Sequence, residues 1–171
     1  MFGSGAQMQS LEGEYRQAQI CMNGHVITAL YDISPGRRQD FCDRCGEKTI
    51  ITCPNCESPI RGSYDAPRVV AINSYHPPAQ CGDCGAPFPW TECRLAAARE
   101  LASDLEQLSP EERGRLIDTL PDLVRDVPMT QVSAGRFKRL AAKAGVEAGG
   151  AFRDILVDVA SETAKKVIWG S

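Results

Sequence analysis

Hydrophobic residues fall at helical spacing in the second half of the chain but not in the first. From Thr91 onward, apolar residues recur three and four positions apart, which is the spacing of one face of an α-helix. Before Trp90, short runs of β-branched and apolar residues alternate with Gly, Pro and Asn. The pattern predicts short strands in the first half and four helices in the second, at about residues 91–108, 110–127, 130–144 and 147–168.

Local sequence signals indicate where these helices begin and end. We expect Thr91 to cap the first helix with its hydroxyl group. The sequence SPEE at residues 109–112 is a capping box with proline at the first helical position. Pro121 is expected to kink or end the second helix. Gly145 is expected to end the third helix, in which Val132 should be buried.

The expected helix at residues 147–168 has the most regular amphipathic pattern. In one interpretation the four helices bury this stripe in a bundle with its own core, as most amphipathic helices do. In the other, part of the stripe stays free for a protein partner or for a second copy of the chain. The sequence favours the bundle. The stripe consists of Phe152, Ile155, Leu156, Val159, Ala160, Ala164, Val167 and Ile168.

The first half of the chain is too poor in Leu and Phe to fold on a hydrophobic core alone. Residues 26–31, 48–52 and 68–72 have the composition of strands. A segment of this size needs another source of stability, and bound metal is the one that the sequence offers. The expected organisation is therefore α+β, with a disordered tail at 1–14, a double zinc-ribbon region at 15–90 and an α-helical region at 91–171.

Eight potential metal ligands occur as four closely spaced pairs. Two cysteines separated by two residues can point at one ion, and the glycines after Cys45 and Cys84 suit the tight turn that this requires. Two pairs together complete a tetrahedral site with no position left for water or substrate. We expect two structural zinc ions, bound by Cys21, His25, Cys42, Cys45, Cys53, Cys56, Cys81 and Cys84.

The four pairs can be combined in two ways. Sequential pairing joins the first pair with the second and the third with the fourth, which gives tandem zinc ribbons. Cross-braced pairing joins the first with the third and the second with the fourth, and the short gap between the second and third pairs is compatible with it. Strand-like runs lie in the outer gaps, where they can form a hairpin between the two pairs of one ribbon, so we favour sequential pairing.

Three Cys and His residues have other interpretations to consider. His25 could be an exposed or hydrogen-bonded imidazole at the start of a strand rather than a ligand. His76 precedes two prolines and is interpreted as a loop histidine. Cys93 has no nearby cysteine partner and is expected to be a free thiol, half-buried against the metal-binding region.

Composition and charge limit the possible partners. The chain of 171 residues contains no run of about 20 apolar residues and no signal-peptide pattern, so we expect a cytoplasmic protein that does not enter a membrane. Its formal net charge is −3, and two Zn²⁺ ions with seven thiolates would make it about −6. This charge and an aromatic content of 6% disfavour non-specific nucleic-acid binding.

The order of the motifs resembles one known family. The segments CMNGHVIT, FCDRCGEKT, CPNCESPIRG, CGDCGAPFPWTE and DILVDVASETAKK are similar to the bacterial domain-of-unknown-function family 2321, over about residues 15–170. The resemblance implies the same eight ligands and leaves His76 and Cys93 outside the motif. It implies no activity, so it supports the architecture and leaves the function open.

The sequence favours a non-enzymatic role. It contains none of the common nucleotide-binding, metalloprotease or serine-hydrolase motifs, and the aspartates of the helices are interpreted as solvated faces. The leading hypothesis is a zinc-binding adaptor, whose helical region docks on a protein partner or on another copy. The loops at 32–40 and 57–67 are candidate contacts, and the PFPW sequence at 87–90 should join the two regions.

Nucleic-acid binding is the alternative hypothesis. Arg136, Arg139 and Lys143 share one face of the third expected helix and could contact phosphates. No small-molecule substrate is expected.

Overall fold

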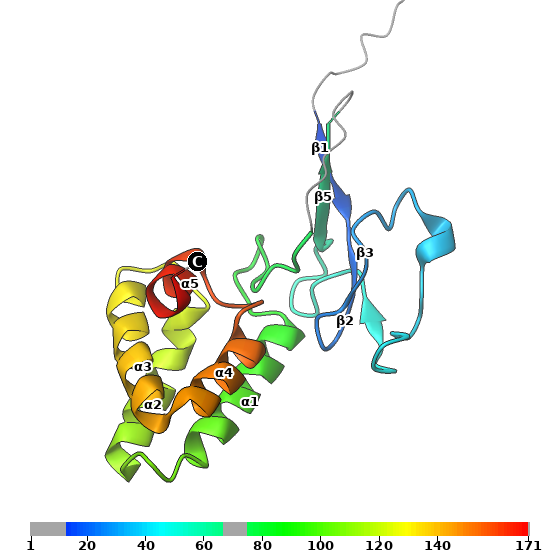
Figure 1. Ribbon diagram of the computed structural model, residues 1–171. Coiled ribbons are helices and arrows are strands. Elements are labelled where there is room, and N and C mark those ends of the chain that lie inside the picture. Colours follow the sequence, from blue (N-terminus) through cyan, green and yellow to red (C-terminus); the bar gives the residue numbers. More distant parts are fainter. Residues whose placement is uncertain (1–12, 67–74, 171) are drawn as a thin grey trace, which may run out of the picture.

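The computed structural model of the protein describes residues 13–66 and 75–170. Within these residues, short strands and loops form one part of the molecule, and five α-helices form the other (Figure 1). The α+β class predicted from the sequence is confirmed. Within the described residues, no helix combines the length and the apolar character that a membrane-spanning segment needs.

In the described part of the chain, the strands form two small antiparallel sheets. In the first sheet β2 lies between β3 and β4, so that Ile20 pairs with Val26 on one side and with Ile50 on the other. In the second sheet β1 pairs with β5, with Tyr15 opposite Tyr64. The strands are β1 (Glu14–Gln17), β2 (Gln19–Cys21), β3 (Val26–Thr28), β4 (Thr49–Ile50) and β5 (Arg61–Asp65).

The expected strands agree with this arrangement only in part. The runs at 26–31 and 48–52 contain β3 and β4, which are shorter than expected, and the run at 68–72 lies outside the described residues. β1, β2 and β5 were not predicted. The segment at 57–67 was wrongly expected to be a loop, because β5 lies within it and pairs with β1. By contrast, the segment at 32–40 is a loop with one short 3-10 helix, η1 (Pro35–Arg37).

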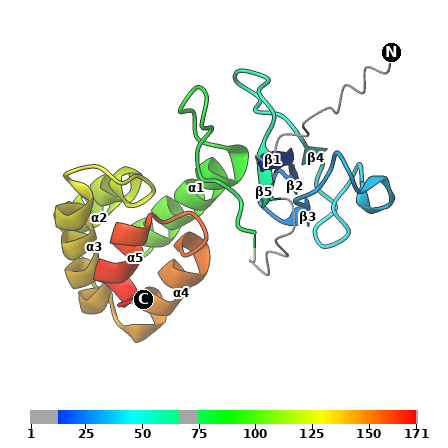
Figure 2. The ribbon, with the colours of Figure 1, turned by 90° about the horizontal axis from the view of Figure 1, so that it is seen from above.

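The helices pack around α3. It contacts α2, α4 and α5, while α1 contacts α2 and α4. In the view of Figure 2, α1 reaches from the helices toward the strands. The helices are α1 (Pro89–Ser103), α2 (Pro110–Leu123), α3 (Thr130–Ala144), α4 (Val146–Leu156) and α5 (Glu162–Trp169).

Several helix boundaries follow the local signals. The capping box at 109–112 is present, and α3 ends at Gly145, whose φ is 109°. The expected cap at Thr91 is wrong. Pro89 already occupies the first turn of α1, and the Thr91 hydroxyl donates instead to the carbonyl of Ala79, 2.7 Å away.

Three details of the helical region differ from the sequence expectation. The single helix expected at 147–168 is two helices, because Ser161 caps a new helix by accepting a hydrogen bond from the Ala164 N–H. Pro121 lies inside α2, which continues to Leu123. Val132 is 45% exposed, because the buried face of α3 passes through Ser133 and its neighbours on that side.

One continuous hydrophobic core links the strands to the helices. It includes Ile20 and Ile60 from the strand region and residues from all five helices. Phe88 and Trp90 lie at the junction, with stacked rings 4.5 Å apart, and the Trp90 indole N–H donates to the carbonyl of Pro78. A Cβ at Gly24 would lie 2.9 Å from the Trp90 Cβ, so the two regions are in close contact here.

Candidate metal centres

The three Cys-x-x-Cys segments share one backbone turn. In each, the first cysteine donates its N–H to the carbonyl five residues later and accepts from the N–H four residues later. These N–H to carbonyl distances are between 2.7 and 2.9 Å for Cys42, Cys53 and Cys81. The turn therefore presents both sulfurs on the same side at three places in the chain.

Cys21 and His25 belong to a fourth turn, in which three residues rather than two separate the ligands. The Cys21 N–H donates to the His25 carbonyl, and Gly24, with a φ of 88°, donates its N–H to the Cys21 carbonyl. The turn lies between β2 and β3, so the sheet positions both side chains. His25 therefore faces its cysteine neighbours rather than standing alone at the start of a strand.

The first and second pairs meet in one cluster. The Cys21 and Cys45 sulfurs are 3.8 Å apart, and the Cys42 sulfur is 3.5 Å from His25 Nδ1. All four ligand atoms lie within 4.8 Å of one another. Cys21 and Cys42 are buried, whereas Cys45 is exposed.

The third and fourth pairs meet in a second cluster with the same plan. The Cys53 sulfur is 3.8 Å from that of Cys84, and the Cys56 sulfur is 3.7 Å from that of Cys81. These four sulfurs also lie within 4.8 Å of one another. The structure therefore brings together all eight residues singled out in the sequence, in sequential rather than cross-braced pairs.

The spacing of these atoms fits tetrahedral coordination of a metal ion. An ion bonded to sulfur at about 2.3 Å holds two sulfurs about 3.8 Å apart, and holds a sulfur and an imidazole nitrogen about 3.5 Å apart. The observed separations are between 3.5 and 3.8 Å. They are far longer than the ~2.05 Å of a disulfide bond. Each cluster can thus hold one metal ion with four protein ligands.

Hydrogen bonds to the sulfurs favour the thiolate form at one position of each cluster. The backbone N–H of Glu47 lowers the pKa of the Cys45 thiol to about 6, and that of Ala86 lowers the pKa of the Cys84 thiol to about 6. Burial acts in the opposite direction on Cys21, whose pKa rises to about 11. Bound metal would overcome this penalty, because it binds the deprotonated sulfur.

Two asparagines beside the clusters were not predicted from the sequence. Asn23 Nδ2 lies 3.6 Å from the Cys45 sulfur, and Asn55 Nδ2 lies 3.4 Å from the Cys84 sulfur. Each asparagine follows the first cysteine of its cluster by two residues, so a repeated Cys-x-Asn sequence was the available signal. Such donors orient a ligand and stabilise its negative charge.

The remaining Cys and His candidates lie outside both clusters. His76 is exposed in a loop, as expected. Cys93 is a free thiol, but the expectation that it is half-buried is wrong. It lies on the exposed side of α1, because the helix buries Thr91 and Leu95 on its other face.

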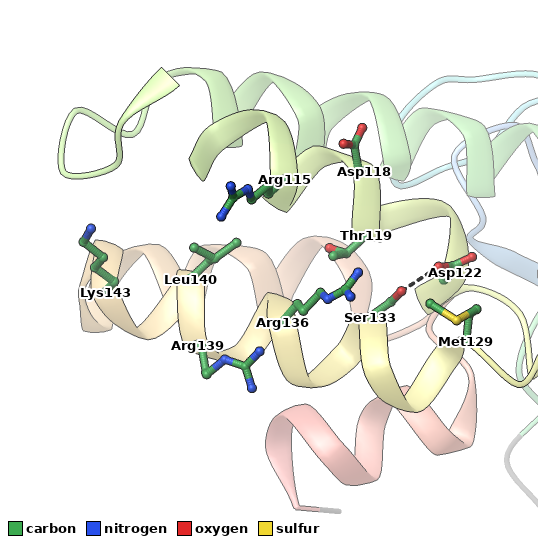
Figure 3. Close-up of a pocket in the computed structure, with 10 residues that line it drawn as sticks. All are labelled: Arg115, Asp118, Thr119, Asp122, Met129, Ser133, Arg136, Arg139, Leu140 and Lys143. Atoms are coloured by element: carbon green, nitrogen blue, oxygen red, sulfur yellow. Dashed lines mark hydrogen bonds between the residues drawn. The ribbon is translucent and has the colours of Figure 1, made fainter. Parts of the chain in front are cut away.

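The basic residues of α3 line a groove against α2. Arg136, Arg139 and Lys143 lie on one side of it, and Asp118 and Asp122 of α2 lie on the other (Figure 3). Arg136, Arg139 and Lys143 therefore share one face of α3 as expected, but the carboxylates of Asp118 and Asp122 face them across the groove.

Comparisons with known proteins give one match. A family model described as "Uncharacterized protein conserved in bacteria (DUF2321)" matches residues 14–168. Searches of curated proteins and of solved structures found no match.

Proposed function

The chain belongs to the bacterial DUF2321 family, and we propose that it is a non-enzymatic zinc-binding adaptor. Two structural zinc ions hold the ribbon region in shape, and the helical region provides the surface for a protein partner or a second copy. The observation that carries the proposal is the complete set of four potential protein ligands in each cluster. Each cluster supplies four protein ligand atoms at tetrahedral spacing, which leaves no open position for water or substrate.

Zinc is the ion that best fits both clusters. Tetrahedral sites of thiolates, or of three thiolates and one imidazole, are typical of structural zinc. None of the eight cysteines forms a disulfide, which suits a protein of the reducing cytoplasm. Iron can also occupy a four-cysteine site, but the histidine of the first cluster favours zinc.

The placement of the histidines supports a non-enzymatic role. The chain has two, of which His25 belongs to the first cluster and His76 is exposed in a loop. Neither is placed as a buried general base beside a nucleophile. The metal sites are closed, so they offer no Lewis-acid position to a substrate.

Metal analysis of the purified full chain is the direct test. We expect close to two zinc ions per chain, and about one in a Cys81→Ser variant, in which only the first cluster is complete. The Cys93→Ser variant is the matched control and should keep both ions, since Cys93 lies outside the clusters. A value near one for the unchanged protein would contradict the proposal of two structural sites.

The adaptor role is tested by capture of the full chain from its native host. We expect a protein partner or a defined oligomer, free of nucleic acid, that is lost when zinc is removed. Salt-sensitive retention of DNA or RNA would contradict this role and favour the alternative hypothesis of a nucleic-acid-binding protein.

A further inference from the structure

A groove of about 670 Å³ runs between α2 and α3. Contacts between the helices lie toward its two ends. At one end Lys143 Nζ lies 2.6 Å from a carboxylate oxygen of Glu112, and at the other the Ser133 hydroxyl donates to Asp122 at 2.6 Å. Figure 3 shows the lining side chains between these ends. These two contacts hold α2 and α3 at a fixed separation at both ends of the groove.

Three arginines line this groove, and Arg115 also acts electrostatically on Glu111 and Glu112 of its own helix. Arg115 comes from α2, and Arg136 and Arg139 come from α3 (Figure 3). None of their guanidinium groups forms an ion pair or hydrogen bond with another described residue. Four cations and two carboxylates line the groove, and a third carboxylate, that of Glu112, pairs with Lys143. The surplus is therefore one positive charge, in a chain whose net charge is −3. Its cationic character is thus local.

Apolar surface accompanies the arginines. Met129, at the start of α3, is 46% exposed, and Leu140 is only half-buried between the charged residues of the groove. Methionine and arginine are enriched at protein interfaces, where arginine can bind a carboxylate through two parallel hydrogen bonds. An occupant that combines acidic and apolar side chains would satisfy both features.

We propose that the α2–α3 groove binds an acidic peptide segment of a protein partner. Carboxylates of the segment pair with Arg115, Arg136 and Arg139, and its apolar side chains contact Met129 and Leu140. This inference rests on the proposed adaptor function and names the surface that carries it.

Other classes of ligand fit the groove less well. A nucleic-acid backbone would bring continuous phosphate charge beside the carboxylates of Asp118 and Asp122. The residues that line the groove also include no aromatic side chain on which a base could stack. A small anion would remain in water beside exposed arginines, where ion pairs are weak. A peptide from a partner excludes that water as it docks, which strengthens each pair.

The test uses a fluorescent synthetic peptide of alternating glutamate and leucine, titrated against the zinc-loaded full chain. We expect saturable binding that weakens about tenfold in the double variant Arg136→Gln/Arg139→Gln. Asp118→Asn should strengthen binding about twofold or more, because it removes a carboxylate that repels the acidic peptide and adds no positive charge. Fluorescence anisotropy measures both changes.

The matched control is Arg99→Gln/Arg153→Gln, which also removes two positive charges, but from exposed positions on α1 and α4 outside the groove. Its affinity for the peptide should stay within about twofold of the unchanged chain. An equal loss in this control, or absence of saturable peptide binding, would overturn the proposal. Tighter binding of a single-stranded oligonucleotide, lost in Arg136→Gln/Arg139→Gln, would also overturn it.

Capture experiments can distinguish an error in the assignment of the groove from an error in the proposed adaptor role. A native partner that is still captured by Arg136→Gln/Arg139→Gln would refute the groove and leave the adaptor role intact. If the unchanged chain captured no protein and formed no oligomer, the adaptor role itself would fail.

Discussion

One backbone position recurs in the three Cys-x-x-Cys turns, and it is occupied by two different residue types. The residue after the second cysteine has a positive φ in each turn, 73° at Gly46, 62° at Glu57 and 72° at Gly85. Glycine adopts this conformation freely, whereas a side chain with a Cβ adopts it at a cost of about 1 kcal/mol. The second cluster therefore contains a local strain that the first does not.

The change Glu57→Gly should stabilise the zinc-bound protein. We expect the free energy of unfolding to rise by roughly 0.5–1 kcal/mol, since relief of the left-handed conformation exceeds the added freedom of the unfolded chain. Glu57 is exposed and forms no side-chain hydrogen bond or ion pair with a described residue, so the change removes little else. Urea denaturation at saturating zinc measures the effect.

Gly46→Ala and Gly85→Ala provide controls of opposite sign. A Cβ at either position would meet no atom within 4 Å, so only the positive φ opposes it. Each should destabilise the protein by about 1 kcal/mol. Stabilisation by either alanine, or destabilisation by Glu57→Gly, would show that the turn is not the source of strain.

At the scale of elements, the helical region depends on a short break near its end. Residues between α4 and α5 carry the hydrophobic spacing of one long helix, yet the chain turns there. Ser161 both accepts from the Ala164 N–H and donates its own N–H to the carbonyl of Leu123, 2.8 Å away at the end of α2. The break lets α5 return against α3.

The change Ser161→Ala should lower the free energy of unfolding by about 1 kcal/mol, because it removes the side-chain cap of α5. For a chain of this size the midpoint of thermal unfolding should fall by about 3 °C. Ser34→Ala is the control, because Ser34 precedes η1 without forming a side-chain cap, and it should change the midpoint by less than about 1 °C. Equal effects from both changes would contradict a capping role for Ser161.

At the scale of the whole molecule, the two metal clusters are not equivalent. Cys53 and Cys81 of the second cluster belong to the continuous core that contains Phe88 and Trp90, whereas the cysteines of the first cluster do not. The second cluster therefore places two of its ligands in the core shared with the helices, whereas the first cluster meets that core only beside its ligands, where Gly24 lies against Trp90. Loss of the two ions should have different consequences.

Cys81→Ser should destabilise the helical region more than Cys42→Ser does. Both cysteines are buried, and each change removes one ligand from one cluster. We expect Cys81→Ser to cost the helices roughly 2 kcal/mol more, because release of that ion loosens the packing against Phe88 and Trp90. Thermal unfolding followed by far-ultraviolet circular dichroism would show it. Equal losses would indicate that both clusters, or neither, support the helices.

Structural features that depend on residues a few positions apart could be predicted from the sequence alone. The four ligand pairs, the capping box at 109–112 and the bounds of α3 at Thr130–Ala144 each depend on residues a few positions apart. Backbone geometry at that range is nearly independent of the rest of the fold, because the turn or the cap is formed by its own residues. This is why the sequence alone indicated the candidate ligands and the change from short strands to helices near Trp90.

Tertiary structure decided what depends on contact between distant segments. The pairing of β1 with β5 joins residues 44 to 51 positions apart, and neither strand has a strong pattern of its own. The break at Ser161 exists because α5 packs against α3, and the groove arginines meet only when α2 and α3 lie side by side. The sequence by itself determined which residues can bind metal. Only packing between distant segments decided how the pairs combine and which charges converge, because residue spacing does not encode those contacts.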